Sequence, residues 1–468
     1  MNNSYDVAIL GAGPGGYVAA IRAAQLGFST AVIEKDKSGG ICLNWGCIPT
    51  KALLKNAEIL HNIKHSSEFG ISIENYSVDF SKIIRRSRDI SDKISKNVDG
   101  LLKKNGVENI KGTGRIINAS GPVTLEIKNN GESREVKAEK LIIATGAGAR
   151  ILPSVPVDRM KVITSTEALA LKEIPESMII VGAGAIGVEF AFFYNTLGTK
   201  VTIIEVLSNV LPLEDEEVSR LLLREFRKQG IEVLLNSRVL ETETVKNGSV
   251  TVSVETPEGK KILNGKIVLS AAGVTGNIDG IGLENTRVKT EKGFISVNKS
   301  DYMTENQNIY AVGDVIGPPL LAHVASAEAI NCVEKLSGLN VPDIDYGSIP
   351  ACTFCQPQVA SIGMTEHAAR EAGLEIKIGK FPFTASGRAF AAGERDGFVK
   401  LIFDAKYGEL LGAHIIGSSA TEILEEAVVA KSHGATAESI IKTIHSHPTF
   451  SEAIMEAAAA AYGEAIHI

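Results

Sequence analysis

The feature that most constrains the fold is a glycine pattern that occurs twice. Val7-Ala-Ile-Leu-Gly-Ala-Gly-Pro-Gly-Gly16 and Ile179-Ile-Val-Gly-Ala-Gly-Ala-Ile-Gly187 both carry Gly-x-Gly-x-x-Gly directly after a short apolar run. In each copy a helical stretch and a second apolar run follow, and the second run leads to an acid, Glu34 or Glu205. The acids lie 205 minus 34, or 171, positions apart, and the glycine patterns keep the same offset. The repeat predicts two βαβ units of the kind that binds dinucleotides.

Each position of this pattern has a defined physical task. The first glycine makes a tight turn, the second lets the backbone approach a pyrophosphate, and the third lets the helix pack on the strand. The amino terminus of the helix then receives the phosphate charge, and the acid accepts hydrogen bonds from ribose hydroxyls. The residues that we expect at the two sites are Gly11, Gly13, Gly16 and Glu34 in the first copy, and Gly182, Gly184, Gly187 and Glu205 in the second.

The residues that follow Glu205 favour NAD over NADP. Val206-Leu-Ser-Asn209 comes next, and the first basic side chain is Arg220. A 2′-phosphate would therefore lie against the carboxylate with no guanidinium to receive it. The alternative is that Glu205 is a surface acid at the end of a strand.

Length and charge narrow the class of protein. A chain of 468 residues is about three times as long as a usual single domain, and its 45 glycines suit an α/β protein with many strand-to-helix turns. The net charge of -7, from 48 basic and 55 acidic side chains, argues against nucleic acid or an anionic membrane as the main partner. The sequence has neither a signal-like start nor an apolar run of about 18 residues, so we expect a cytoplasmic protein without a transmembrane helix.

Two cysteines lie close together in Gly39-Gly-Ile-Cys-Leu-Asn-Trp-Gly-Cys-Ile-Pro-Thr-Lys51. Five cysteines in a chain of this size do not make a secreted disulfide framework, so Cys42 and Cys47 point to redox chemistry or metal binding. In a regular helix, positions five apart are separated by roughly 7.5 Å, whereas disulfides span about 4.4 to 6.8 Å between Cα atoms. If the pair closes, the backbone must depart from a regular helix, and Gly46 and Pro49 suit such a departure. The alternative is two buried cysteines that do not pair.

The same segment resembles the signature of the pyridine nucleotide-disulfide oxidoreductases. Those proteins carry Gly-Gly-Thr-Cys-x-x-x-x-Gly-Cys-x-Pro-[Ser/Thr]-Lys, or close variants, just after the acid of their FAD-binding unit. The departures here are Ile41 and Trp45, where the family usually has threonine and a small apolar residue. Neither of these positions carries the chemistry.

The resemblance implies a role for each reactive residue of the segment. Cys42 would exchange with the substrate disulfide, and Cys47 would face the flavin of FAD. Lys51 would lie near the flavin ring and pair with Glu189, which follows the third glycine of the second unit. The alternative for Lys51 is an ordinary lysine on a helix surface.

Two further segments resemble FAD-binding parts of the family. Leu141-Ile-Ile-Ala-Thr-Gly146 is similar to the segment that closes the first half of the FAD site, and Ile309-Tyr-Ala-Val-Gly-Asp314 is similar to the second FAD signature. A short carboxylate at a strand end, such as Asp314, can accept hydrogen bonds from ribityl hydroxyls. Taken alone, each segment is also compatible with a strand and a turn. The resemblance assigns these residues to the cofactor sites: Gly114, Thr145, Gly146, Ala147, Gly273, Asp314, Leu320, Leu321, Ala322 and His323.

One segment departs from the family pattern. Gly273-Val-Thr-Gly-Asn277 stands where the family usually has Gly-Arg-x-Pro-Asn. The departure bears on local contacts with the nicotinamide nucleotide and not on the class of protein.

The carboxy-terminal segment His445-Ser-His-Pro-Thr-Phe-Ser-Glu452 matches the family's His-x-x-x-x-Glu signature. Thiol chemistry needs a base near neutral pH, which imidazole provides, and a carboxylate can orient the ring and stabilise its protonated form. We expect His447 to be the base and Glu452 its partner. His445 is the competing candidate, but it lacks the spacing to Glu452 and is interpreted as structural. In the family the base comes from the other subunit, so the resemblance implies a homodimer.

Cys352-Thr-Phe-Cys355 forms a second close pair of cysteines. A C-x-x-C pattern can be a redox pair or half of a zinc site, but neither a second such pattern nor a nearby histidine accompanies it. We interpret this pair as reduced and structural, and we expect no metal site. Residues 398–403 and 410–416, joined by a polar turn, predict a hairpin of an antiparallel interface domain.

The resemblance covers essentially the whole chain. It predicts an α/β fold with two Rossmann-like dinucleotide-binding domains and a C-terminal α+β dimerisation domain. The expected boundaries are 1–149 for the first part of the FAD-binding domain, 150–275 for the NAD-binding domain, 276–347 for the second, central part of the FAD domain, and 348–468 for the interface domain.

Within the family, three features favour the members that oxidise protein-bound dihydrolipoyl groups with NAD. Glu205 has no neighbouring arginines, the end of the chain from Ala461 to Ile468 carries no extra thiols, and the dithiol itself is present. The implied partners are the lipoyl-bearing subunits of 2-oxo acid dehydrogenase or glycine cleavage complexes, which would supply the lipoyl group. The alternatives are a reductase of another disulfide, such as glutathione disulfide, and a non-catalytic docking subunit.

Overall fold

The computed structural model describes residues 3–245 and 248–468, which divide into two compact units. The first unit comprises the chain up to Leu53 together with Asp79–Arg150 and Gly273–Ile344. The second comprises Leu54–Val78, Ile151–Ala272 and Asp345–Ile468. Each unit is assembled from segments that are far apart in the sequence.

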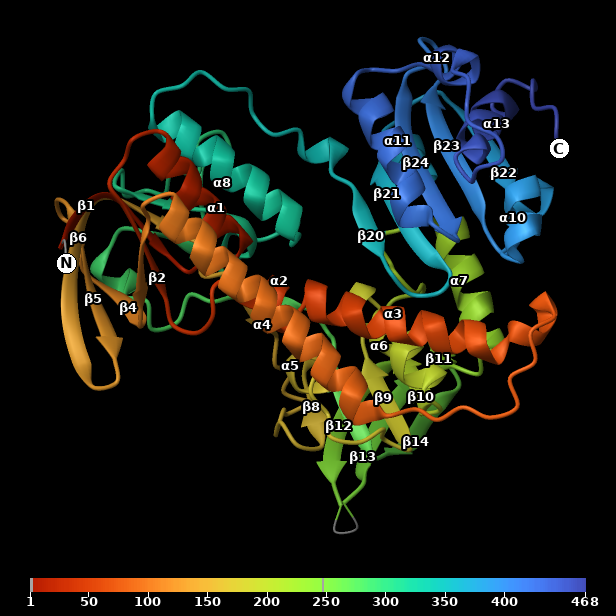
Figure 1. The fold of residues 1–468 in the computed structure, drawn as a ribbon, viewed down its shortest axis with the longest axis horizontal. Helices are drawn as coiled ribbons and strands as arrows, with labels where there is room; N and C mark the ends of the chain where they lie inside the picture. Colours follow the sequence, from red (N-terminus) through yellow and green to blue (C-terminus); the bar gives the residue numbers. More distant parts are fainter. Residues whose placement is uncertain (1–2, 246–247) are drawn as a thin grey trace. The chain divides into compact units, whose positions relative to one another are not determined.

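A seven-stranded sheet forms the centre of the first unit (Figure 1). In spatial order its strands are β3 (Glu108–Lys111), β2 (Thr30–Glu34), β1 (Ser4–Leu10), β6 (Glu132–Ile143), β5 (Val123–Asn129) and β4 (Thr113–Asn118), and β19 (Ile309–Ala311) also pairs with β6. The strands β3, β2, β1, β6 and β19 are parallel, whereas β4, β5 and β6 form an antiparallel meander. Because ligands of such sheets bind beyond the carboxyl ends of the parallel strands, this edge positions the candidate site.

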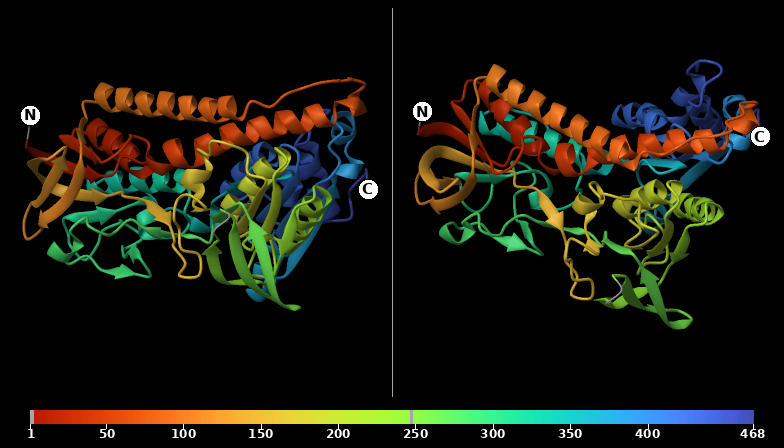
Figure 2. Two further views of the ribbon diagram at one scale, coloured as in Figure 1. Left: turned by 90° about the horizontal axis from the view of Figure 1, so that it is seen from below. Right: turned by 60° about the horizontal axis from the view of Figure 1, so that its bottom comes forward.

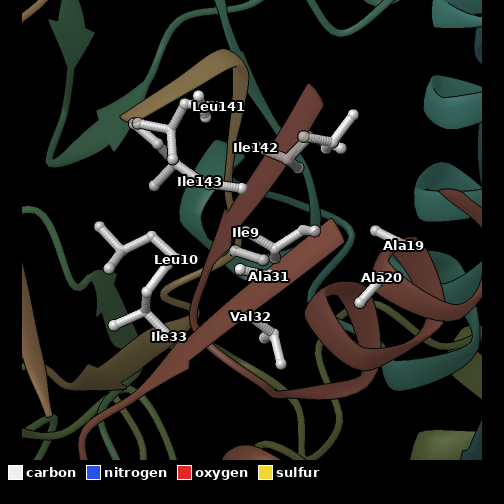
Figure 3. Close-up of a cluster of buried hydrophobic side chains, with 14 of the residues drawn as sticks. Ile9, Leu10, Ala19, Ala20, Ala31, Val32, Ile33, Leu141, Ile142 and Ile143 are labelled. Atoms are coloured by element: carbon white, nitrogen blue, oxygen red, sulfur yellow. The ribbon is translucent and has the colours of Figure 1, made fainter. Parts of the chain in front are cut away.

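The parallel strands are buried in an aliphatic core, which explains their continuous apolar sequence. Figure 3 shows Ile9 of β1, Val32 of β2 and residues 141–143 of β6 within one cluster. Ala19 and Ala20 of helix α1 (Pro14–Gln25) belong to the same cluster. Their small side chains let the helix lie close to the strands.

Helix α8 (Ala322–Leu336) lies beside α1 against this core (Figures 1 and 2). Helix α4 (Phe80–Lys104) is the longest helix among the described residues (Figure 2). The remaining elements of the unit are α2 (Gly40–Trp45), the start of α3 (Cys47–Lys64), η2 (Leu283–Asn285), η3 (Gly313–Ile316), the pair β7 (Ala147–Ala149) and β16 (Val274–Gly276), and the pair β17 (Thr290–Glu291) and β18 (Phe294–Ile295).

A five-stranded parallel sheet forms one part of the second unit. Its order is β11 (Glu232–Leu234), β10 (Lys200–Ile204), β9 (Ser177–Val181), β15 (Ile267–Ser270) and β8 (Val162–Ile163). Helix α6 (Ala185–Thr196) connects β9 to β10 and is buried on nearly every side, as its run of aromatic residues requires. The neighbouring elements are α5 (Ser165–Ala168), α7 (Glu216–Lys228), η1 (Ser66–Phe69) and a three-stranded antiparallel sheet of β12 (Arg238–Thr244), β13 (Val250–Thr256) and β14 (Gly259–Gly265).

A second five-stranded sheet, which is antiparallel, forms the carboxy-terminal part of this unit. Its order is β20 (Ala351–Thr353), β21 (Gln358–Gly363), β24 (Leu410–Gly417), β23 (Phe398–Asp404) and β22 (Ile376–Pro382). Helices α11 (Ala420–Ser432) and α13 (Glu452–Ala460) pack on it around one apolar core (Figure 1). The remaining elements are η4 (Tyr346–Ser348), α9 (Glu366–Glu371), η5 (Phe383–Ala385), α10 (Gly387–Ala392) and α12 (Ala437–Lys442).

The structure confirms the two predicted βαβ units, which are β1-α1-β2 and β9-α6-β10. It also confirms the predicted hairpin, because β23 pairs antiparallel with β24, with a bulge at Ile402 and Phe403. The domain boundaries expected from the sequence stay a prediction. Within residues 3–245 and 248–468, no helix has both the length and the apolar character that crossing a bilayer requires.

A buried ion cluster joins α7 to the antiparallel sheet of the second unit. Lys400 of β23 is 1% exposed, and its ammonium donates to Asp215 and Glu217 at 3.0 Å and to Glu366 at 2.7 Å. These carboxylates compensate the charge of the buried ammonium, and removing Lys400 would leave the buried Asp215 carboxylate without its cation. The cluster therefore fixes the start of α7 against β23.

Beside this cluster lies a carboxyl group whose protonation affects stability. Glu214 accepts a hydrogen bond from Ser361 at 3.1 Å, and its second carboxyl oxygen is buried without a partner among the described residues. Burial raises the pKa of Glu214 to about 7 against the opposing effect of that hydrogen bond. The folded chain thus binds this proton more tightly than the unfolded chain does. The folded protein must therefore lose stability as the pH rises from 4.5, the ordinary pKa of a glutamate, towards about 7.

We predict that Glu214→Gln reduces the change of the free energy of unfolding with pH by about 3 kcal/mol, because one pKa unit corresponds to about 1.4 kcal/mol. The free energy of unfolding by urea, measured for both proteins between about pH 5 and pH 8, checks this. Relative to the parent, the variant should gain stability as the pH rises. Glu216→Gln, at an exposed neighbour, is the matched control. Parallel pH curves for the parent and Glu214→Gln would contradict the prediction.

Candidate functional site

The first glycine pattern forms a tight loop between β1 and α1. Gly11 has a φ of +102°, and a Cβ there would lie 2.5 Å from the carbonyl oxygen of Ala144, so only glycine fits. A Cβ at Gly16 would lie 1.8 Å from the carbonyl oxygen of Gly11, as expected where a helix packs closely on a strand. At Gly13 the nearest atom to a Cβ is the Cα of Gly40 at 3.9 Å. This part of the loop has room for the approach of a ligand.

The second pattern repeats this geometry. Gly182 has a φ of +109°, a Cβ at Gly187 would lie 2.0 Å from the carbonyl oxygen of Gly182, and nothing lies within 4 Å of a Cβ at Gly184. Helices α1 and α6 both begin after a glycine N-cap, and no described side chain caps either of them. Their first N–H groups can therefore receive phosphate oxygens. The residues present fit two dinucleotides.

The two acids of the repeat make matching hydrogen bonds. Each is 7% exposed, so Glu205 is not the surface acid that was the alternative. One carboxylate oxygen accepts the N–H of the residue between the first two glycines at 2.7 Å, and the other accepts an N–H two residues further along at 2.8 Å. A carboxylate has about four acceptor positions, which leaves capacity for a ribose hydroxyl. The donors are Ala12 and Asp36 to Glu34, and Ala183 and Leu207 to Glu205.

The second FAD-like segment places Asp314 in η3, beyond the end of β19. Burial raises the pKa of Asp314 to about 6, and the negative charge of Glu328 adds to the effect. Glu328 of α8 is 2% exposed and accepts the N–H of Gly313 at 2.7 Å, so it holds this turn in place. Glu328 is not among the site residues predicted from the sequence. Its position among alanines on one face of a helix is the signal that indicates burial.

The segment that departs from the family pattern lies against the first FAD-like segment. Thr145 donates from its hydroxyl to the carbonyl oxygen of Asn277 at 2.8 Å, and the Asn277 amide donates to the Thr145 carbonyl oxygen at 2.9 Å. The N–H of Gly276 donates to the carbonyl oxygen of Gly293 at 3.0 Å, which a proline cannot do. A Cβ at Gly276 would lie 2.7 Å from that oxygen. Local packing in this chain therefore requires the glycine that replaces the usual proline.

The other residues predicted for the cofactor sites lie around the same sheet. A Cβ at Gly114 would lie 2.7 Å from Leu10, so this glycine packs on the end of β1. Leu321 is the N-cap of α8, and no described side chain caps that helix either. The remaining positions are Leu320 before this cap, Ala322 and His323 in the first turn of α8, Gly146 with a φ of +71°, Ala147 paired with Gly276, and Gly273 beside the Arg150 side chain.

The dithiol segment contains the predicted interruption of a helix. Helix α2 ends at Trp45 and α3 begins at Cys47, and Gly46 between them has a φ of -148° and a ψ of -114°. This confirms the departure from a regular helix. Pro49 lies inside the first turn of α3, where its missing N–H is tolerated. The contribution of Pro49 to the departure stays a prediction, because in an unbroken helix its missing N–H would leave the Trp45 carbonyl oxygen without a partner.

The side chains of Cys42 and Cys47 form a hydrogen bond across the interruption. This hydrogen bond and then burial raise the pKa of the Cys42 thiol, while the positive charge of Lys51 opposes the rise. Lys51 therefore lies close enough to the pair to act on it electrostatically. Cys47 is the more exposed of the two cysteines.

The carboxy-terminal segment brings His447 and Glu452 together. The Nδ1 of His447 lies 2.8 Å from Glu452 Oε1, and Thr449 N–H donates to the other oxygen at 2.7 Å. Burial alone would raise the pKa of Glu452, but these two hydrogen bonds and the charges of His447 and His445 lower it below its ordinary value. His445 makes a separate contact at 2.5 Å with Glu426 of α11, which agrees with a structural role.

Three predictions made from the sequence concern residues outside these clusters. Glu189 of α6 is 4% exposed and accepts the N–H of Phe354 at 2.9 Å, and its pairing with Lys51 stays a prediction. The Cys355 thiol donates to the carbonyl oxygen of Pro357, and the interpretation of Cys352 and Cys355 as a reduced, structural pair stays a prediction. In the part of the chain that the structure describes, no group of three or more His, Cys, Asp or Glu residues is arranged to hold a metal ion.

Comparison with known proteins gives matches over nearly the whole chain. The family model described as pyridine nucleotide-disulphide oxidoreductase matches residues 5–329, and the model of the dimerisation domain of that family matches residues 349–458. Dihydrolipoyl dehydrogenases from Rhizobium etli and Bacillus subtilis are 43% and 44% identical to the chain, each over 100% of both sequences. The mitochondrial dihydrolipoyl dehydrogenase of Pisum sativum is 41% identical over 99% of the chain and 92% of its own length.

Solved structures give the same result. LpdA from Mycobacterium tuberculosis matches with a TM-score of 0.89 and 27% identity over 98% of this chain and 99% of that chain. The HOCl-induced flavoprotein disulfide reductase RclA from Escherichia coli matches with a TM-score of 0.85 and 28% identity over 97% and 99%. The paired dinucleotide loops, the dithiol and these matches lead to one conclusion: the chain belongs to the pyridine nucleotide-disulphide oxidoreductase family.

Proposed function

We propose that this chain oxidises protein-bound dihydrolipoyl groups to lipoyl groups and reduces NAD+, which is the activity of a dihydrolipoyl dehydrogenase. Relatives with that name match at 41 to 45% identity over 97 to 100% of the chain, which supports the activity. Within the structure, the observation that carries the reaction class is the pair of thiols that meet across the interruption at Gly46.

Membership of the family implies binding of FAD and NAD(P), and the dimerisation domain supports a homodimer. FAD, when bound, supplies a two-electron carrier between a dithiol and a nicotinamide nucleotide. The loops at Gly13 and Gly184 would hold the two pyrophosphates, and Glu34 and Glu205 would receive ribose hydroxyls. Asp314 would bind hydroxyls of the FAD chain. NAD is favoured over NADP because Glu205 would repel a 2′-phosphate.

The reaction of the dithiol follows the rules of thiol–disulfide exchange. A substrate thiolate attacks Cys42 Sγ, a mixed disulfide forms, and the Cys42–Cys47 bond breaks with Cys47 leaving as a thiolate. The second substrate thiolate then attacks the substrate sulfur of the mixed disulfide, which closes the lipoyl disulfide and releases Cys42. Two electrons pass from the substrate to the cysteines, and a base must accept the proton of each attacking thiol in turn.

His447 is the proposed base for this exchange. Its Nδ1 faces the Glu452 carboxylate at 2.8 Å, which leaves Nε2 to accept the proton. Because the pKa of Glu452 is below its ordinary value, Glu452 stays ionised near neutral pH and can stabilise the imidazolium. In the proposed homodimer, His447 serves the dithiol of the other subunit.

The roles of the two cysteines rest on the resemblance to the family. Cys42 is proposed as the cysteine that exchanges with substrate and Cys47 as the cysteine that faces the flavin. Exposure in the single chain does not favour this assignment, because Cys47 is the more exposed. We also propose, on the same resemblance, a cytoplasmic location and partners that are lipoyl-bearing subunits of 2-oxo acid dehydrogenase or glycine cleavage complexes.

Initial rates with a panel of substrates test the proposed function. The FAD-loaded protein should oxidise dihydrolipoamide with NAD+ at least about a hundredfold faster than with NADP+. The reason is that leaving the charge of the 2′-phosphate without a partner costs about 3 kcal/mol. Glutathione disulfide with NADPH should give little turnover. Preference for that second pair would favour a reductase of another disulfide, and no turnover with any pair would favour a docking subunit.

Trapping a mixed disulfide tests the assignment of the cysteines. In Cys47→Ser the thiol of Cys42 can attack a linear disulfide such as hydroxyethyl disulfide, whose leaving thiol diffuses away. No partner thiol then releases Cys42, so we expect one mixed-disulfide adduct per chain by mass spectrometry. Cys42→Ser should give at most a small fraction of that adduct. Anaerobic dithiol should also no longer produce a long-wavelength flavin absorbance in Cys47→Ser. Adduct on Cys42→Ser alone would reverse the two roles.

Removing the base should slow the reaction without loss of the fold. We expect His447→Gln to lower kcat/KM for dihydrolipoamide by about 10² to 10⁴-fold, the usual contribution of a general base. Glu452→Gln should have a smaller effect, because the ring remains. His367→Gln, at an exposed histidine on α9, is the control. A loss of less than about tenfold in His447→Gln would assign the base to another residue.

A further inference from the structure

One face of helix α4 lies along the whole dithiol segment. Ser87, Ser91 and Ser95 are spaced by four residues and are each at most 5% exposed. Residues at this spacing share one side of a helix, and serine is small enough to let the neighbouring backbone approach. This serine face contacts the chain both before and after the interruption at Gly46.

The contacts before the interruption hold the chain that leads into α2. Ser95 donates from its hydroxyl to the carbonyl oxygen of Ser38 at 2.7 Å, and the Asn44 amide donates to the same oxygen at 3.1 Å. The Ser38 hydroxyl donates to Asp99, also on α4, at 2.6 Å. The segment ahead of Cys42 is therefore bound to α4 through both backbone and side chain.

The contacts after the interruption hold the first turns of α3. Ser87 donates from its hydroxyl to the carbonyl oxygen of Pro49 at 3.0 Å, and this bond is buried. Arg86 donates to the carbonyl oxygen of Ala52 at 3.2 Å. Both acceptors are carbonyl oxygens within α3, which accept hydrogen bonds from the helix itself. The two bonds from α4 are therefore additional to those that build the helix. Their effect is to fix the first turns of α3, up to Ala52, on α4.

At the interruption itself, Arg88 lies over Trp45. The guanidinium carbon is 4.6 Å from the centroid of the indole ring, within the range of a cation–π interaction. Burial lowers the pKa of Arg88, and the guanidinium also donates to Ser91 at 3.1 Å. Trp45 directly precedes Gly46 and is the only tryptophan of the chain. The last residue before the interruption is thus also fixed to α4.

We propose that Ser87, Arg88 and Ser95 of α4 are positioning residues for the dithiol, which hold the helical segments on both sides of Gly46 in one arrangement. The inference rests on the proposed redox role of Cys42 and Cys47. In the reduced state these contacts help to keep the two segments in register, whereas in the oxidised state the disulfide does so as well. The contacts therefore raise the effective concentration of one thiol at the other and favour the disulfide.

The test measures the dithiol–disulfide equilibrium of the FAD-loaded dimer. The protein is equilibrated anaerobically with mixtures of oxidised and reduced dithiothreitol, and the thiols are counted by alkylation and mass spectrometry. Each exchange converts two S–H groups of the protein to one S–S bond and reduces one cyclic disulfide of the reagent to its dithiol. Ser87→Ala combined with Arg88→Met should shift the equilibrium about tenfold towards the dithiol, or about 30 mV.

Controls on the exposed face of the same helix separate positioning from general stability. Ser81→Ala combined with Arg85→Met makes the same chemical changes where both side chains are exposed, and we expect a shift of less than about twofold. Ser95→Ala alone, which removes one hydroxyl, should shift the equilibrium a few-fold even if the double variant does not fold. Arg88→Lys keeps a cation near the ring and should restore part of the shift caused by Arg88→Met.

The fluorescence of Trp45 gives a second readout that does not depend on turnover. Its emission should change on reduction in the parent, and Arg88→Met but not Arg85→Met should alter the emission of the reduced protein. A parent that forms the disulfide, with folded α4 variants whose equilibria match the control, would overturn this inference alone. A parent that never forms the disulfide would overturn the proposed function together with it.

Discussion

The interruption of the helix at Gly46 is the constraint on which the rest of the dithiol site depends. Two cysteines five residues apart cannot meet along an unbroken helix, so one residue between them must leave the helical conformation. Gly46 takes that role, and a Cβ there would lie 3.1 Å from the carbonyl oxygen of Ile41. The interruption divides a long helix into α2 and α3, and each part must then be fixed separately. Contacts from other elements replace the hydrogen bonds that a continuous helix would have provided.

The paired dinucleotide loops are also fixed by contacts from other parts of the chain, in this case by carboxylates. In both copies a buried glutamate binds the N–H of the loop at 2.7 Å, so the acid that is expected to receive a ribose also fixes the glycine loop. Glu328 does the same for the turn at Gly313. Each of these loops is therefore held by a carboxylate from a neighbouring element. Replacing Glu34 or Glu205 would disturb the shape of the loop as well as the selection of the nucleotide.

The sequence could predict the parts of the site that depend on local spacing. The two glycine patterns with their acids, the hairpin of β23 and β24, and the contact of His447 with Glu452 all follow from residues within one short segment or one repeat. It could not predict contacts between distant segments, such as Asn277 with Thr145 or Ser95 with Ser38, because no local pattern encodes the partner.

The environment of His447 bears on where the base acts. Its side chain is 77% exposed, whereas Glu452, which holds the ring, is mostly covered. Glu452 is fixed in turn by the N–H of Thr449, so the ring is supported from its own chain on the Nδ1 side. The opposite nitrogen faces away from that support. A base whose Nδ1 side is fixed and whose Nε2 side is exposed is suited to a target outside its own segment, as the proposed role of His447 in a homodimer requires.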